Sequence, residues 1–342
     1  MPAQRVPQRD RRIRLLRLGS VDQVAAPGQA TARRRARGVG QRAALTAVNL
    51  VVSATVFGVV IAAVLALAAV GFTLQYSVSN VFNLAFSETM VVSGFAALAA
   101  NQAGIPLAGA ALVGVAAGAV VSLLLNQFVY QPFARRGVSV FQMLVISLAV
   151  SLVLANTLLA VVGPLSFHYD ASPTVLFTVA SAAVTDLQLT VILLAVVTMI
   201  GMHVLLKRSR LGMAMRAASV DGGLAQSCGI HTQRVVATAW AISGALCGLA
   251  GVALFTISSS FSATSGRTFI VLVIAAAVLG GIGDAYGAML GALVLGLATE
   301  LTAVWLDPSF KIAIALLVLI GVLMVRPQGI RAEFSTGRAL QV

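Results

Sequence analysis

Long uncharged apolar runs dominate the chain, and only a few short polar stretches separate them. No charged residue occurs from Ala43 to Ser87, and after Glu88 none occurs until Arg135. A helix needs about 20 apolar residues to cross a bilayer, and runs rich in Ala, Gly, Leu and Val suit helices better than the alternating strands of a barrel. The pattern therefore predicts an all-α fold, a polytopic helical membrane bundle.

Basic clusters predict the orientation of this bundle, because Lys and Arg are enriched in cytoplasmic loops. If the Arg-rich N-terminus and the pair Arg135–Arg136 both lie inside, the number of crossings between them is even. We expect about 8–10 transmembrane segments in the cell (inner or plasma) membrane, some short or broken, with both termini cytoplasmic. The expected segments are 43–70, 71–85, 87–104, 107–131, 138–162, 187–206, 235–257, 268–283, 286–306 and 310–325.

The longest polar interruption inside the apolar region runs from Lys207 to Arg234. Arginines at 208, 210 and 216 interleave with Leu211, Met213 and Met215, which predicts a short amphipathic helix that begins near Leu211 and whose apolar side chains can enter a partner's groove. Asp221 can cap a second short helix, and Gly229 can end it. The segment is either a docking surface for a water-soluble partner or an ordinary cytoplasmic loop that obeys the positive-inside rule.

Composition excludes a soluble domain. Hydrophobic residues make up 59% of the 342 residues and charged residues 10%, with a mean hydropathy of +0.98, whereas soluble chains carry about 25% charged residues. The net charge is +13, but eleven arginines lie between Arg5 and Arg42, so the basicity belongs to the tail and does not indicate nucleic-acid binding. We expect a disordered cytoplasmic tail at 1–42 that can meet membrane lipid, a membrane domain at 43–330 and a second cytoplasmic tail at 331–342.

No arrangement typical of an enzyme or a metal site is present. The two cysteines, Cys228 and Cys247, lack the paired spacing of metal ligands, and neither Lys207 nor Lys311 follows a phosphate-binding glycine run. The sequence therefore predicts no cofactor, no metal and no ATP binding on this chain.

Two polar groups lie at predicted membrane depth. Glu88 is a functional candidate because an ionisable residue there is costly. It can hold a broken helix by accepting backbone N–H bonds, contact a substrate ammonium group, or simply meet the positive end of a helix dipole. The run Gly280–Asp284 is typical of a discontinuous helix beside a translocation path, and tight helix packing is the alternative.

These stretches resemble the permease subunits of ABC importers for branched-chain amino acids, of the high-affinity leucine/isoleucine/valine type, a family that also includes urea and amide importers. The likeness covers about 43–330. Phe86 and Ser87 depart from it, since a histidine and a glycine are usual there. The matching residues are Gly71, Phe72, Tyr76, Asn83, Glu88, Gly94, Leu211, Gly212, Arg216, Ala217, Asp221, Ala225, Gly229, Ile230, Val278 to Asp284, Gly287 to Ala292 and Arg326 to Ile330.

The resemblance implies a permease that forms the translocation path for branched-chain or related hydrophobic amino acids. Its implied partners are a second homologous permease subunit, two ABC ATPase subunits that hydrolyse the ATP, and an extracytoplasmic solute-binding protein. The implied ATPase-coupling residues are Arg208, Leu211, Gly212, Arg216, Ala217, Asp221, Ala225, Gly229 and Ile230, and the implied path residues are Tyr76, Asn83, Glu88, Gly280, Gly281, Gly283 and Asp284.

Two other functions stay open. An ion-coupled secondary transporter of small solutes would need intramembrane carboxylates, for which Glu88, Asp284 and Glu300 are available. A membrane enzyme is the third possibility, although the sequence has no triad, metal or paired-carboxylate pattern.

Overall fold

The computed structural model describes residues 27–330, apart from 170–173, 180–181 and 259. The chain divides into two compact units, 1–48 and 49–342. The described part of the first unit is the beginning of helix α1 (Pro27–Ser79), so residues 27–42 are helical and not disordered as predicted. Ala, Arg and Gln, which are frequent there, are strong helix formers. Residues 1–26 of the predicted tail and the predicted tail at 331–342 lie outside the described residues.

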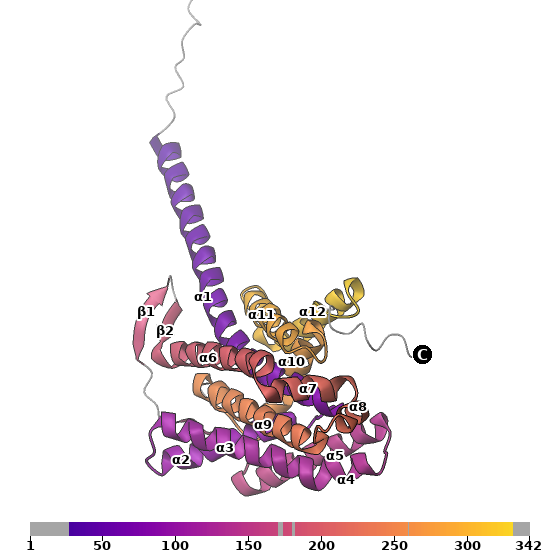
Figure 1. Ribbon diagram of the computed structural model, residues 1–342. Coiled ribbons are helices and arrows are strands. Elements are labelled where there is room, and N and C mark those ends of the chain that lie inside the picture. The colour runs from indigo at the N-terminus through magenta and orange to yellow at the C-terminus, as the bar shows by residue number, and fades with distance from the viewer. Residues whose placement is uncertain (1–26, 170–173, 180–181, 259, 331–342) are drawn as a thin grey trace, which may run out of the picture. The chain divides into compact units, whose positions relative to one another are not determined.

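Helices make up nearly all of the described chain, which confirms the all-α bundle (Figure 1). Six helices of the described part are long and apolar enough to cross a membrane, and α10 and α12 are shorter apolar helices. An antiparallel hairpin of β1 (Val175–Val179) and β2 (Ala182–Thr185) was not predicted. The other elements are α2 (Phe86–Gln102), α3 (Leu107–Leu125), the π-helix η1 (Asn126–Tyr130), α4 (Gln131–Arg135), α5 (Val140–Val162), α6 (Asp186–Arg208), α7 (Arg210–Val220), α8 (Gly222–Ser227), α9 (Thr232–Ile257), α10 (Ser265–Gly280), α11 (Ala285–Thr302), the 3-10 helix η2 (Pro308–Phe310) and α12 (Lys311–Val325).

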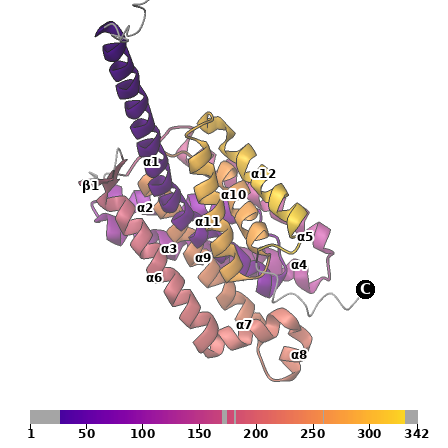
Figure 2. The same ribbon diagram turned by 90° about the horizontal axis from the view of Figure 1, so that it is seen from above.

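The second unit is built from two groups of packed helices. Helices α2, α3 and α9 form one group, and α10, α11 and α12 form the other (Figure 2). Contact between α2 and α10 joins the groups, and the C-terminal part of α1 packs against both, with Gly71 beside Leu246 of α9 and Gly58 beside Leu297 of α11. Helices α5 and α6 bury few of their side chains, as expected of helices that face lipid.

A seam of small residues brings α3 and α9 into close backbone contact. A Cβ added to Gly118 would lie 2.4 Å from the carbonyl oxygen of Gly244, and one added to Gly248 would lie 2.7 Å from that of Gly114. Small residues four apart allow such an approach, because lipid is as apolar as leucine and helix association depends on van der Waals packing. Ser122 continues the seam and donates to the carbonyl oxygen of Trp240 at 2.8 Å.

Helix α1 is continuous across 43–79, so the prediction of two separate spans, 43–70 and 71–85, was wrong. Gly71 lies inside the continuous helix, where its small size allows close contact with α9. The hydroxyls of Ser77 and Ser79 donate to carbonyl oxygens of their own helix, at 2.9 and 2.7 Å. The helix ends at Asn80, whose φ is +53°.

The end of the bundle that carries α7 and α8 is called the inner end, and the opposite end the outer end. Helix α9 starts at the inner end with Thr232, and Ser79 lines the same cavity as Thr232. The part of α1 that belongs to the second unit therefore runs from the outer end to the inner end. Between the start of this part of α1 and Arg135 the chain crosses the bundle three times and not four. The prediction that the N-terminus is cytoplasmic rested on an even number of crossings, so this argument no longer supports it.

Candidate functional site

The segment 80–85 is a non-helical re-entrant turn inside the bundle. After Ser79 the chain turns back, and α2 begins at Phe86, whose carbonyl oxygen accepts a hydrogen bond from the Cys247 thiol at 3.1 Å. Cys247 lies about 22 Å along α9 from its inner end, at a rise of 1.5 Å per residue, so α2 starts near mid-depth. Asn80 and Asn83 both lie in this non-helical stretch.

Side chains from other helices satisfy the backbone of this turn. The Leu84 N–H donates to Oγ of Ser147 on α5 at 3.2 Å, and that hydroxyl lies 2.9 Å from the Phe82 carbonyl oxygen, to which it can donate. The Ala85 N–H donates to Oδ1 of Asn83 at 3.0 Å. Irregular backbone at membrane depth is tolerated only where protein buries it or where it lines a cavity, and this segment meets that condition.

A residue of the π-helix η1 fixes the side chain of Asn83. Its Oδ1 also accepts a hydrogen bond from the Tyr130 hydroxyl at 2.7 Å, and the Tyr130 ring packs on Trp240 with 4.8 Å between centroids. A π-helix within an α-helix often marks a functional position. The sequence analysis missed Tyr130, Ser147 and Cys247, because nothing near them in sequence indicates a contact with 80–85.

A cavity of about 290 Å³ opens below the turn, at the inner end. Polar groups from four elements line it, including Ser79, Asn126, Tyr130 and Gln233. Arg135 closes one side and donates to Oε1 of Gln233 at 3.1 Å. The predicted path residue Tyr76 is half-buried, with its ring edge-to-face on Phe82.

Glu88 lies in the first turn of α2, and 2% of its surface is exposed. Its Oε2 has no hydrogen-bond partner among the described residues. It does not hold the re-entrant turn by accepting its N–H groups, since those bonds go to Ser79, Asn83 and Ser147. A buried carboxylate oxygen without a partner is costly.

The glycine run forms the tight turn between α10 and α11 and does not break a helix, so that prediction was wrong. A Cβ on Gly280 would lie 2.1 Å from the Gly287 carbonyl oxygen, and Gly281 and Gly283 have φ of +108° and +99°. Asp284 caps α11, accepting from the N–H groups of Tyr286 and Gly287 at 3.1 and 3.2 Å. Tight packing, the alternative reading, is what the structure contains.

The segment after α12, residues 326–330, packs against this turn and is hydrogen-bonded to α10 beside it. The Ile330 N–H donates to the Leu279 carbonyl oxygen at 2.9 Å, and a Cβ on Gly329 would lie 2.7 Å from the Gly281 nitrogen. Two stretches that the resemblance matched separately, Val278 to Asp284 and Arg326 to Ile330, are therefore one structural unit at the inner end.

The polar segment forms the two short helices predicted, α7 and α8 (Figure 2). Ser209 caps α7 by accepting from the Gly212 N–H at 2.9 Å, and Asp221 caps α8 by accepting from the Leu224 N–H at 2.9 Å. Gly229, with φ of +84°, follows α8 as expected of a glycine that ends a helix.

The predicted coupling residues divide into a buried set and an exposed set. Gly212 and Ala225 are buried; a Cβ on Gly212 would lie 2.4 Å from the Leu205 carbonyl oxygen, so this glycine sets the bend between α6 and α7. Arg216 donates to the Leu206 carbonyl oxygen at 2.7 Å and so ties α7 to α6. Arg208, Leu211, Asp221 and Gly229 are exposed, whereas Ala217 is half-buried and Ile230 packs against the core.

Four large apolar side chains project from α7 and α8 into the open. Val220 and Leu224 are 80% and 65% exposed, and the sequence analysis did not single them out; Leu211 and Met213 are also exposed. We call these four residues the apolar rim. The coupling residues lie at the inner end, and the structure does not bring them together with Glu88 at mid-depth.

Comparison with known proteins identifies the family. The family described as "Branched-chain amino acid transport system / permease component" matches residues 54–325. The chain belongs to this family. The branched-chain amino acid permease match contains the re-entrant turn, Glu88, the glycine turn and both short inner helices. No solved structure matches the chain.

Several relatives of this permease carry related names. The high-affinity branched-chain amino acid transport system permease protein LivH of Escherichia coli (strain K12) is 28% identical over 289 residues, which cover 80% of this chain and 92% of that protein. The corresponding protein BraD of Pseudomonas aeruginosa is 29% identical over 290 residues, covering 80% and 93%. LivM of E. coli, another permease protein of that system, is 33% identical over 164 residues, covering 47% and 36%.

Proposed function

We propose that this chain is the permease subunit of an ABC importer that moves branched-chain amino acids across the plasma membrane. The family match over 54–325 carries the proposal, and the names of the relatives supply the substrate class. A re-entrant turn at mid-depth above a polar cavity supports a translocation path through this region.

The proposed partners are a second permease subunit, two ATPases and an extracytoplasmic binding protein. Similarity to both LivH and LivM supports a paired permease. The apolar rim on α7 and α8 supports docking of a water-soluble ATPase, because exposed apolar residues at the inner end gain from burial in a partner's groove. Movement of the docked ATPases would then be transmitted to α6 and α9, which flank the two short helices.

The inner end is proposed to be cytoplasmic, with the C-terminal segment on the same side. Lys207, Arg208 and Arg210, the pair Arg135–Arg136, and Arg326 all lie at the inner end, in agreement with the positive-inside rule. The outer end then carries the β-hairpin and the loop that holds Tyr169 to the Gly94 carbonyl oxygen at 2.9 Å.

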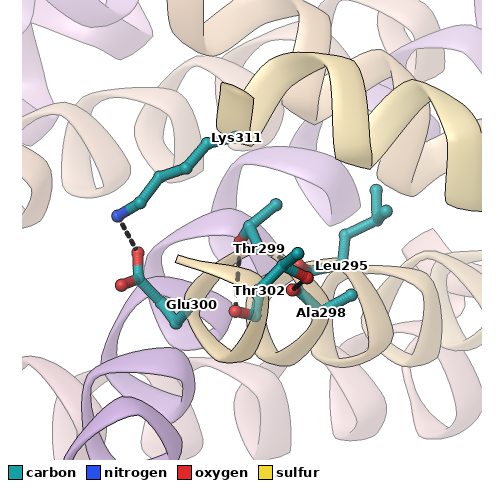
Figure 3. A network of polar contacts seen from close by, with 7 residues as sticks. Leu295, Ala298, Thr299, Glu300, Thr302 and Lys311 are labelled. Carbon is teal, nitrogen blue, oxygen red and sulfur yellow. Dashed lines mark hydrogen bonds and ion pairs between the residues drawn. The ribbon is translucent and has the colours of Figure 1, made fainter. Parts of the chain in front are cut away.

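The alternative function is ion-coupled secondary transport. Two of the three carboxylates that could bind a coupling ion already interact with other groups of the protein. Asp284 caps α11, and Glu300 forms an ion pair with Lys311 at 2.5 Å (Figure 3). Neither arrangement leaves a carboxylate open to a coupling ion.

Uptake of leucine into proteoliposomes that hold the complete complex tests the proposal. We expect uptake that requires ATP inside the vesicle and the binding protein outside, and that persists when ion gradients are abolished. Uptake that follows a proton or sodium gradient without ATP would establish the alternative.

A further inference from the structure

Glu88 and Arg267 are residues of opposite charge on the two helices, α2 and α10, that are in contact. A Cβ on Gly266 would lie 3.0 Å from the Ser87 carbonyl oxygen. Glu88 follows Ser87 and Arg267 follows Gly266, so Glu88 and Arg267 lie at similar depth in the bundle. Arg267 is the cationic residue of α10, one residue after the glycine that touches α2. Glu88 and Arg267 do not form an ion pair; in the part of the chain that the structure describes, the ion pair is that of Lys311 and Glu300.

Each charge is costly where it lies. Glu88 is buried with Oε2 unpartnered among the described residues. Arg267 is exposed in the first turn of α10, where the positive end of the helix dipole opposes a cation. Its depth corresponds to that of Cys247, near the middle of the bundle, where a guanidinium that faces lipid is unfavourable. The exposed side of Arg267 therefore requires water or a polar ligand.

We propose that Glu88 and Arg267 recognise the zwitterionic backbone of an amino acid on its way through the permease. The carboxylate of Glu88 would pair with the substrate ammonium group, and Arg267, together with the N-terminus of α10, would pair with the substrate carboxylate. One molecule with both charges satisfies two groups that leave each other unpaired. This inference rests on the proposed function and narrows the substrate class to α-amino acids, because urea and simple amides lack the two charges.

Leucine uptake by the complete reconstituted complex tests the inference with Glu88→Gln, Arg267→Gln and the double variant. Each single variant should lower uptake roughly tenfold or more, since each loses one hydrogen bond between charged groups, and the double variant should be at least as poor as the worse single one. Glu300→Gln is the matched control, because it also removes an acid from a helix yet lies in an ion pair at the outer end (Figure 3). It should transport as the wild type does.

A binding measurement separates recognition from a structural role. Leucine should raise the thermal midpoint of the purified wild-type complex without binding protein, whereas its analogues that lack the amino group or the carboxylate should not. Glu88→Gln and Arg267→Gln should abolish the leucine effect.

Recovery of uptake in the double variant, or single variants that transport and bind leucine normally, would overturn the inference while leaving the proposed function intact. If the wild-type complex takes up no leucine at all, the proposed function fails, and the inference fails with it.

Discussion

Single residues hold the non-helical backbone of this permease in place. The re-entrant turn has no regular hydrogen-bond ladder, so its N–H and C=O groups depend on a few side chains from distant parts of the sequence. Ser147 on α5 serves two backbone groups of the turn, at Leu84 and Phe82. In a bilayer no water replaces such a partner. A buried backbone group that loses its hydrogen-bond partner costs about 1–3 kcal/mol of stability.

Ser147→Ala should therefore destabilise the protein by about 1–3 kcal/mol, because it leaves the Leu84 N–H without its acceptor. The thermal midpoint of the purified protein measures the effect, and leucine uptake should fall with it. Thr198→Ala is the control, since the Thr198 hydroxyl is exposed and bonds only to Leu194 of its own helix. Equal midpoints for the two variants would mean that Ser147 does not support the turn.

The glycine turn makes a second prediction at the residue scale. Gly281→Leu should lower both stability and transport, because a side chain at φ of +108° is strained by about 1–3 kcal/mol and because Gly329 packs directly on the Gly281 backbone. Gly321→Leu is the matched control, because a Cβ there meets nothing within 4 Å. Ala315 of the same helix would not serve as a control, because it is fully buried.

Membrane insertion of Gly281→Leu should be normal, since leucine is as apolar as lipid. Quantification of the inserted protein by immunoblot, with uptake normalised to it, decides the matter. Transport by Gly281→Leu at the level of Gly321→Leu would contradict the role of this turn.

At the scale of elements, the short helices α7 and α8 connect two long helices, α6 and α9. Their caps, Ser209 and Asp221, fix where each begins, and each cap contributes about 1 kcal/mol to its helix. Because Arg216 is bonded to the end of α6, reversing its charge would also disturb this link. The apolar rim is a cleaner place to test docking, since its side chains are exposed.

Leu224→Glu should uncouple ATP hydrolysis from transport while the permease folds normally, because Leu224 is 65% exposed and the new charge would be buried only on docking. Gln226→Glu adds the same charge to an exposed position of α8 and should have a much weaker effect. Co-purification of the ATPase and its hydrolysis rate are the measurements. Normal assembly and uptake by Leu224→Glu would remove α8 from the docking surface.

On the scale of the whole molecule, the crossing count decides which side each end faces. In the second unit α1 runs from the outer to the inner end as one helix. The apolar span of α1, Val48–Ser79, is 32 residues long and extends about 48 Å at 1.5 Å per residue. A hydrocarbon core is about 30 Å thick, so one helix crosses it with length to spare.

Cysteine labelling of intact cells tests this topology. In a Cys228→Ser background, which removes the exposed native thiol, Leu50→Cys should react with an impermeant reagent from outside. Val220→Cys, on the apolar rim, should react only after permeabilisation. Labelling in the reverse order would invert the orientation of the bundle.

The sequence by itself determined the class of the protein, most helix limits, and both ends of α8, the cap at Asp221 and the stop at Gly229. These features are local. A segment that crosses the bilayer only has to be apolar along its own length, and a helix cap bonds only to the first turn of its own helix, as Asp221 does with the Leu224 N–H.

Only the tertiary structure decided that 43–79 is one helix, that the glycine run is a turn to which Ile330 is hydrogen-bonded, and that α2 meets α10 next to Glu88 and Arg267. In a membrane the hydrophobic effect does not select among helix pairings, so small-residue packing and polar contacts between distant segments select them. Those contacts, such as Gly118 with Gly244, have no signal at short range in the sequence.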